Sequence, residues 1–294
     1  MSGHEVRALP AAAVLMAVLA APATAAGPEQ SDVPYVPTPW VVVDAMLELA
    51  AIGPKDFVVD LGSGDGRLVI AASKRHGARG FGVDIDSGLV RTARQEAKRQ
   101  GVADRVEFVE ENLFVTQIGR ATVMTLYLYP RVMMQLRPRF LEELKPGTRI
   151  VSHEFDFEDW RPDAQRTISV PDKPYGPPRS EIFLWIVPAN AAGDWRWRSG
   201  DGGEVALTLA QAFQVLDGRP SVGGRPGRLE DGRMRGESIR FILRSEAGGR
   251  AITQEYHGRV SGDTITGTVR QDGVESEWKA TRARRGQIAV TGNG

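Results

Sequence analysis

The chain has 294 residues, of which 41% are hydrophobic and 25% are charged, as expected for a folded protein with one large or two ordinary domains. Lysine and arginine together number 37, as do aspartate and glutamate, so no overall basic charge points to nucleic acid. Cysteine is absent, which excludes disulfide bonds, a lipidated cysteine and the cysteine clusters of zinc or redox sites. We predict no metal site and no nucleic-acid partner.

The first 26 residues have the pattern of a secretory signal peptide. Arg7 precedes an apolar run over residues 8–21, and Ala23-Thr24-Ala25 has the small-x-small pattern of a cleavage site. Because the apolar run is short for a membrane span, we predict no stable transmembrane segment. We expect a bacterial protein that is periplasmic or secreted. Glu5 reduces the basic character of the segment, which leaves a cytoplasmic or membrane-anchored protein as the alternative.

Residues 27–188 alternate between strand and helix patterns. A helix is predicted over residues 41–49, where apolar side chains recur at helical spacing. Beyond it we expect strands at 57–61, 80–84, 106–109, 121–127 and 148–153, with helices at 67–74, 87–100 and 131–144. Two later extended runs, 167–170 and 181–187, suit an antiparallel hairpin. This order predicts an α/β domain with a doubly wound, mostly parallel sheet.

A glycine-rich motif follows the first of these strands. Gly62, Gly64 and Gly66 form Gly-x-Gly-x-Gly, whereas a dinucleotide-binding turn has Gly-x-Gly-x-x-Gly. The carboxylate of Asp60, at the end of the strand, would repel a phosphate but attract the cationic amino-acid end of S-adenosylmethionine. The motif therefore predicts a site for this methyl donor.

Two further polar residues follow the next strands of the sheet. Asp84 ends the second strand, at a distance along the chain that suits an acid accepting the hydroxyls of a ribose. Asn112 follows the third strand, and its amide can both donate to and accept from an adenine edge. An asparagine in a loop is also a common turn former, so that alternative stays open for Asn112.

The stretch from Tyr35 to about Pro188 resembles the class I S-adenosylmethionine-dependent methyltransferases, with residues 60–66 as their glycine motif and Asp84 as their ribose acid. It is most similar to the lysine methyltransferases related to the mitochondrial ATP-synthase c-subunit enzyme and to their bacterial relatives. The shorter motifs that carry this likeness are Tyr35-Val-Pro-Thr-Pro39, Gly62-Ser-Gly-Asp-Gly-Arg67 with Val69-Ile70-Ala71-Ala72, and Met133-Met134-Gln135-Leu136.

The sequence departs from its relatives at two places. Asn112 stands where many of them have an acid. Thr125-Leu-Tyr-Leu-Tyr-Pro130 replaces the Asp/Asn-Pro-Pro-Tyr motif of enzymes that methylate amino groups of nucleic acids.

The resemblance implies a Rossmann-like fold, S-adenosylmethionine as cofactor and a protein lysine as methyl acceptor. It also implies a donor-site role for Thr38, although a residue between two prolines can be only part of a rigid extended segment. Tyr127, Tyr129 and His153 are candidates for the acceptor pocket, and no catalytic residue is assigned beyond them. One tyrosine can instead pack against a helix, and His153 with Glu154 can be a hydrogen-bonded pair at the core edge.

Two other functions remain open. A small-molecule methyltransferase would use the same donor site. A non-catalytic, exported binding module could retain the methyltransferase fold, and the signal segment favours it, whereas the glycines and acids of the motif favour an enzyme.

Residues 189–294 form a second predicted domain, made of short strands separated by glycine turns. Gly232-Arg-Met-Arg-Gly236-Glu-Ser-Ile239 recurs as Gly258-Arg-Val-Ser-Gly262-Asp-Thr-Ile265, and each copy predicts a strand, a tight turn and a strand. We expect a small antiparallel β-barrel or sandwich. Trp195, Trp197 and Trp278 are predicted to form its core rather than a ligand site.

Overall fold

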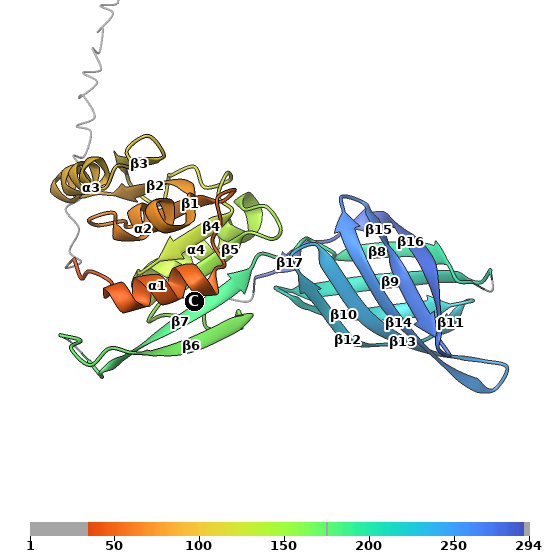
Figure 1. Cartoon of the computed structure of the whole chain (residues 1–294). Helices are drawn as coiled ribbons and strands as arrows, with labels where there is room; N and C mark the ends of the chain where they lie inside the picture. The colour runs from red at the N-terminus through yellow and green to blue at the C-terminus, as the bar shows by residue number, and fades with distance from the viewer. Residues whose placement is uncertain (1–34, 175, 201, 291–294) are drawn as a thin grey trace, which may run out of the picture.

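A computed structural model describes residues 35–174, 176–200 and 202–290. The predicted signal peptide, residues 1–26, lies outside the described residues. The described part of the chain forms two sheets, one covered by helices and one closed into a barrel (Figure 1). No helix in these ranges is long and apolar enough to cross a membrane.

The first sheet has the strand order β3-β2-β1-β4-β5-β7-β6. Its strands are β1 (Phe57–Leu61), β2 (Arg79–Asp84), β3 (Val106–Glu110), β4 (Val123–Leu126), β5 (Arg149–His153), β6 (Ala164–Ser169) and β7 (Arg179–Ile186). Only β7 runs antiparallel to its two neighbours, which confirms the doubly wound, mostly parallel sheet and its terminal hairpin. The chain order reverses at β1 and β4, where such sheets bind ligands beyond the carboxyl ends of the strands.

Four helices cover this sheet: α1 (Trp40–Leu49), α2 (Arg67–His76), α3 (Ser87–Arg99) and α4 (Pro130–Glu143). Strand residues alternate between two apolar clusters. Val58 packs with residues of α1, α2 and α3, while Val59 packs with residues of α4. Strand β4 ends one residue earlier than predicted, so Tyr127 and Tyr129 lie beyond it, close to the reversal point of the sheet.

The second sheet closes into a barrel of eight antiparallel strands. They are β8 (Gly193–Arg198), β9 (Glu204–Ala212), β10 (Val215–Val222), β12 (Arg228–Arg235), β13 (Ser238–Ala247), β14 (Arg250–Ser261), β15 (Thr264–Gln271) and β16 (Val274–Arg285). Each strand pairs with the next, and β16 returns to pair with β8. The short β11 (Arg225–Pro226) and β17 (Ile288–Ala289) pair with β10 and β9. Of the two predicted alternatives, the structure has the barrel.

The predicted repeat corresponds to two hairpins, β12–β13 and β14–β15. Their two-residue turns begin at Gly236 and Gly262, with φ of 57° and 58°, a backbone conformation that glycine adopts without strain.

Aromatic side chains fill the barrel. Trp195, Trp197 and Trp278 are 1%, 6% and 6% exposed, and the rings of Trp197 and Trp278 lie 5.3 Å apart. The hydroxyl of the buried Tyr256 donates to Oε1 of Gln254 at 3.1 Å. These contacts confirm that the three tryptophans are core residues, because a barrel of eight strands is only wide enough for its own side chains or one small ligand.

One turn of the barrel belongs to the core of the first domain. Phe213, between β9 and β10, is 3% exposed and packs in the cluster that α4 covers. Its ring stacks on Trp160 at 5.4 Å, with the Arg137 guanidinium 5.2 Å from its centroid. Beside it, Nε2 of Gln214 donates to the carbonyl oxygen of Arg161 at 2.5 Å. The boundary predicted at residues 188 and 189 thus separates two sheets that share an apolar contact.

Candidate active site

The glycine loop joins β1 to α2 at the reversal point of the sheet. Gly62, Gly64 and Gly66 have φ of 76°, 54° and 77°, where other residues are strained. A Cβ on Gly66 would also lie 2.5 Å from the ring of Phe108, and one on Gly62 would lie 2.9 Å from Leu128. The loop therefore requires glycine at these positions and leaves its backbone open to close approach.

Asp84 fastens this loop to the end of β2. Its Oδ2 accepts a hydrogen bond from the amide of Gly64 at 2.8 Å, and its Oδ1 accepts one from the amide of Asp86 at 3.0 Å. Each carboxylate oxygen can accept a second hydrogen bond, so the side chain can still bind hydroxyl groups. The ribose contact stays a prediction.

Asp60 is a carboxylate buried at the end of β1, only 3% exposed. Burial raises its pKa to about 7, the charges of Asp84 and Asp65 add to this effect, and the hydrogen bond from Thr125 opposes it. Thr125 Oγ1 lies 2.7 Å from Oδ1 of Asp60. A cation bound beside Asp60 would offset the cost of ionising it, so the site fits the ammonium group of S-adenosylmethionine.

The segment Tyr35–Pro39 lies over the glycine loop. The ring of Tyr35 contacts the position that a Cβ on Gly64 would occupy. Arg67 Nη1 donates to the carbonyl oxygen of Thr38 at 2.7 Å, while its Nη2 pairs with Asp65 at 2.6 Å. Burial and the charge of Asp65 raise the pKa of Tyr35 to about 12, so its phenol is neutral. Arg67 thus joins two motifs that are far apart in the sequence, residues 35–39 and residues 65–67.

Thr38, Tyr127 and His153 come together at the carboxyl ends of β4 and β5. Thr38 Oγ1 lies 3.3 Å from His153 Nδ1, and His153 Nε2 lies 3.0 Å from Ser180 Oγ. The rings of Tyr127 and His153 are 4.1 Å apart. Tyr129 makes a different ring contact: it is 47% exposed, and its ring lies 6.3 Å from that of Phe155.

The electrostatics of this cluster keep its rings neutral. Burial lowers the pKa of His153 to about 4, an effect that Glu154 opposes and Lys173 reinforces. Burial, together with the charge of Glu154, raises the pKa of Tyr127. His153 is therefore a weak base near pH 7, better suited to hydrogen bonding than to accepting a proton.

Asn112 forms a turn in this structure. Its Oδ1 accepts a hydrogen bond from the amide of Phe114 at 2.9 Å, as in an Asx turn. The turn-forming alternative describes this geometry, and the contact to adenine stays a prediction for its Nδ2 group.

Lys173 is a site residue that sequence reasoning missed. Its Nζ pairs with the carboxylate of Glu154 and donates to the carbonyl oxygen of Arg179 at 2.8 Å. Glu154 directly follows β5 and has φ of 69°, in the left-handed region. The one available signal was a lysine within the proline-rich loop at 171–179, next to the expected acceptor side.

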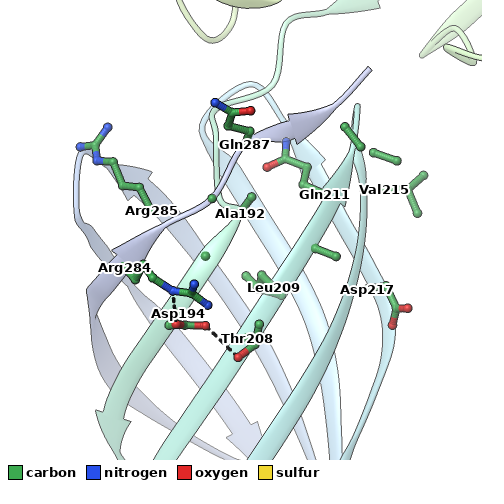
Figure 2. Close-up of a pocket in the computed structure, with 15 residues that line it drawn as sticks. Ala192, Asp194, Thr208, Leu209, Gln211, Val215, Asp217, Arg284, Arg285 and Gln287 are labelled. Atoms are coloured by element: carbon green, nitrogen blue, oxygen red, sulfur yellow. Dashed lines mark hydrogen bonds and ion pairs between the residues drawn. The ribbon is translucent and has the colours of Figure 1, made fainter. Parts of the chain in front are cut away.

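A surface groove of about 380 Å³ lies on the outside of the barrel, beneath the segment that leads from β16 to β17 (Figure 2). Three of the polar groups labelled there pair with one another: Arg284 Nε lies 2.8 Å from Asp194, which accepts from Thr208 Oγ1 at 2.8 Å (Figure 2). The groove shares no residue with the glycine loop, and no cluster of potential metal ligands occurs among the described residues.

The strand order, the glycine loop after β1 and the acids that end β1 and β2 define a class I S-adenosylmethionine-dependent methyltransferase. Residues 60–164 match the family model of the ANTKMT methyltransferase domain. A protein-lysine N-methyltransferase of Saccharolobus islandicus is 41% identical over 156 residues, which cover 53% of this chain and 94% of that protein. The chain belongs to this family of protein-lysine N-methyltransferases, which confirms the resemblance and the donor S-adenosylmethionine.

Two other proteins are also similar to this chain. The ATP-synthase c-subunit lysine N-methyltransferase of Xenopus laevis is 32% identical over 150 residues, covering 51% of this chain and 66% of that protein. A solved structure of an RNA methyltransferase from Salinibacter ruber, in complex with S-adenosyl-L-homocysteine, is 50% identical, with a TM-score of 0.47; it covers 52% of this chain and 94% of that one. Each similarity spans about half of the present chain.

Proposed function

We propose that the protein transfers the methyl group of S-adenosylmethionine to the side-chain amine of a protein lysine. The observation that carries this proposal is the 41% identity across 94% of a protein-lysine N-methyltransferase, together with the glycine loop and acids of the donor site. In the reaction, the amine lone pair attacks the methyl carbon while the carbon–sulfur bond breaks. The chain then has to align donor and acceptor and exclude water.

The donor-site roles follow from chemistry and position. Asp60 would pair with the donor ammonium, Asp84 would accept the ribose hydroxyls, and the glycine loop would let the ligand approach the backbone. Asn112 would contact adenine, and Thr38 would border the donor from the overlying segment.

The acceptor side has a different task, because a lysine ammonium must lose its proton before it can attack. Tyr127 and His153 are neutral near pH 7, so we assign them to positioning and shaping the pocket. Tyr129, which is 47% exposed, would contact the protein that presents the lysine. The pKa of Glu154 is lowered, so this carboxylate is also a weak base, and the proton would leave to water.

We propose two domains, a methyltransferase domain over residues 27–188 and a β-barrel domain over residues 189–294, preceded by a signal peptide. The pattern of residues 1–26 supports a periplasmic or secreted bacterial protein whose mature chain begins near Ala26 or Gly27. N-terminal sequencing of protein from fractionated cells tests this. An intact Met1 in the cytoplasmic fraction would instead support the cytoplasmic alternative.

The function is tested with radiolabelled S-adenosylmethionine and the purified full chain. Calorimetry measures donor binding, and parallel reactions contain a lysine-rich protein, the same protein with acetylated lysines, an RNA or a mixture of small amines. Label on the unmodified protein alone supports the proposal. Label on RNA contradicts the expected lack of a nucleic-acid partner, and label on small amines alone supports a small-molecule methyltransferase. Donor binding without transfer supports a binding module.

A further inference from the structure

A lysine of the chain itself lies beside the proposed acceptor pocket. The Lys173 side chain is 11% exposed, and its Nζ contacts the Glu154 carboxylate and the carbonyl oxygen of Arg179, the latter at 2.8 Å. Most lysines remain exposed, and burying an ammonium requires a partner of opposite charge. Glu154 supplies that charge.

Short contacts connect this ion pair with the donor loop. Glu154 Oε1 lies 3.3 Å from Nε2 of His153, whose other ring nitrogen lies 3.3 Å from Thr38 Oγ1. The carbonyl oxygen of Thr38 in turn accepts the hydrogen bond from Arg67, which follows Gly66. The ammonium of Lys173 thus lies on the acceptor side of the site.

The backbone of Glu154 is held in a left-handed conformation, with φ of 69°. Such strain in a non-glycine residue persists only where surrounding structure fixes it, and it is concentrated at functional sites. The Glu154 amide donates to the carbonyl oxygen of Glu181 at 2.8 Å, which ties this conformation to β7. Burial would raise the pKa of the Glu154 carboxyl, but hydrogen bonds from Lys173 and Ser180 outweigh it, so the pKa is lowered.

We propose that Glu154 receives the ammonium of the acceptor lysine, and that Lys173 occupies this position in the free protein until the substrate lysine displaces it. This inference rests on the proposed lysine methyltransferase function. Lys173 presents the same chemical group as the substrate to the same carboxylate. Its neighbours Asp172 and Pro174 are exposed, so moving Lys173 away from Glu154 uncovers no core side chain at these positions.

When Lys173 occupies the position, the substrate lysine can bind only the fraction of molecules in which the position is free. Its apparent affinity equals its intrinsic affinity multiplied by that fraction. If Lys173 fills the position in about nine molecules of ten, Lys173→Gln should lower the KM for poly-L-lysine roughly tenfold with kcat unchanged. In the Lys173→Gln background, Glu154→Gln removes a charge-assisted contact and should raise that KM at least about tenfold. With Lys173 present the rise should be smaller, because the same change also releases Lys173 from the position. Lys55→Gln is the matched control, because Lys55 is exposed in the turn before β1, at the amino ends of the parallel strands and away from their carboxyl ends.

A second measurement does not require methyl transfer. Acetic anhydride labelling, followed by mass spectrometry, should modify Lys173 roughly tenfold more slowly than Lys55. Poly-L-lysine itself consumes acetic anhydride, so the readout is a ratio: adding poly-L-lysine should raise the labelling of Lys173 relative to that of Lys55. Calorimetry with S-adenosylmethionine shows that each variant remains folded and competent for donor binding.

The two proposals fail in distinguishable ways. If no lysine substrate is methylated but poly-L-lysine still exposes Lys173 to the reagent, the methyltransferase function is wrong and the shared binding position stands. If poly-L-lysine is methylated, but Lys173→Gln leaves its KM unchanged and labelling of Lys173 is independent of poly-L-lysine, the occupancy proposal is overturned.

Discussion

The two sheets of this protein differ in how they treat buried polar groups. The parallel sheet holds Asp60 at the end of β1 with a single hydrogen bond from Thr125 and a pKa raised to about 7. In the barrel, by contrast, the polar groups around Gln254 satisfy one another: Gln254 accepts from Tyr256 at 3.1 Å and donates to Gln271 at 2.9 Å. A buried carboxyl whose ionised form is destabilised indicates a site for a ligand that supplies the opposite charge. Buried polar groups that hydrogen-bond to one another indicate a structural core.

The largest effect should come from the pH dependence of Asp60. The folded chain keeps its proton up to about pH 7, whereas the unfolded carboxyl loses it near 3.8, so the folded state binds more protons between these values. Its contribution therefore makes the free energy of unfolding fall as pH rises through this window, by roughly 4 kcal/mol. Denaturant titrations of wild type and Asp60→Asn between pH 4 and pH 8 should show this difference.

Asp194 of the barrel is the matched control with the opposite sign. Hydrogen bonds from Arg284 and Thr208 lower its pKa, so its contribution is present at neutral pH and is lost as pH falls through its folded pKa. Asp194→Asn should therefore remove only a small, acid-sensitive contribution. Equal profiles for the two variants would contradict the distinction between the sheets.

Phe213 tests whether the two sheets are independent, because this residue of the barrel packs in the core of the methyltransferase domain. Phe213→Ala should lower the free energy of unfolding by about 3–4 kcal/mol, through the lost stacking on Trp160 and the cavity left behind. Tryptophan fluorescence and circular dichroism during denaturant titration measure it. Val274→Ala, at a residue 69% exposed on the barrel, is the control and should change stability by less than about 0.5 kcal/mol.

The same residue bears on a shortened chain that ends near Pro188. Such a chain lacks Phe213 and Gln214, so Trp160 loses one of its two stacking partners and the Arg161 carbonyl loses its donor. We expect it to bind S-adenosylmethionine but to unfold at lower denaturant than the domain does in the full chain. Equal denaturant midpoints would show that the contacts of Phe213 and Gln214 with the first domain contribute nothing to its stability.

Glycines with positive φ in the two domains can be compared by the stability lost when each is replaced by alanine. A Cβ on Gly66 would lie 2.5 Å from Phe108, whereas one on Gly262 would meet nothing within 4 Å, and φ is positive at both residues. Gly262→Ala should cost about 1 kcal/mol, for backbone strain alone. Gly66→Ala adds overpacking and should cost about 3 kcal/mol. Thermal unfolding of both variants should rank them in this order, and similar losses would mean that Phe108 moves aside freely.

The last prediction concerns donor binding by Asp84 rather than stability. Removing its charge-assisted contacts with a ribose should weaken donor binding at least about tenfold, roughly 1.5–3 kcal/mol. Calorimetry of Asp84→Ala measures this, with Glu107→Ala, at an exposed residue of β3, as the control. Because Asp84 also holds the amide of Gly64, unfolding must be measured in parallel. An unchanged affinity in a folded Asp84→Ala variant would exclude the ribose contact.

Local patterns were enough to predict the first sheet. The apolar runs and the glycine spacing are encoded within a few residues, and β1 has the predicted bounds of 57–61. Closure of the barrel depends on the pairing of β16 with β8, in which Thr281 lies opposite Arg196, 85 residues earlier in the chain. No local pattern distinguishes that pairing from the open edges of a sandwich.

The candidate site shows the same limit. Tyr127 and Tyr129 were equivalent in the sequence, and the structure alone brings Tyr127 to His153 and leaves Tyr129 exposed. The sequence did not mark Lys173 as a site residue, because its role depends on its ion pair with Glu154. The antiparallel pairing of β7 with β5 brings these two residues together. Contacts made across strands are set by topology rather than by spacing along the chain.

Closure of the barrel also has a consequence for aggregation. A sheet edge presents unpaired amides and carbonyls that can recruit a strand from another chain. Closure leaves the described barrel only short edges, at β11, at β17 and where β10 and β12 pair through Val215 and Arg233 alone. The longer edges among the described strands are β3 and β6, the outer strands of the first sheet. Exposed charges at Glu107, Glu110 and Arg166 lie on those two strands, where they oppose the approach of another chain.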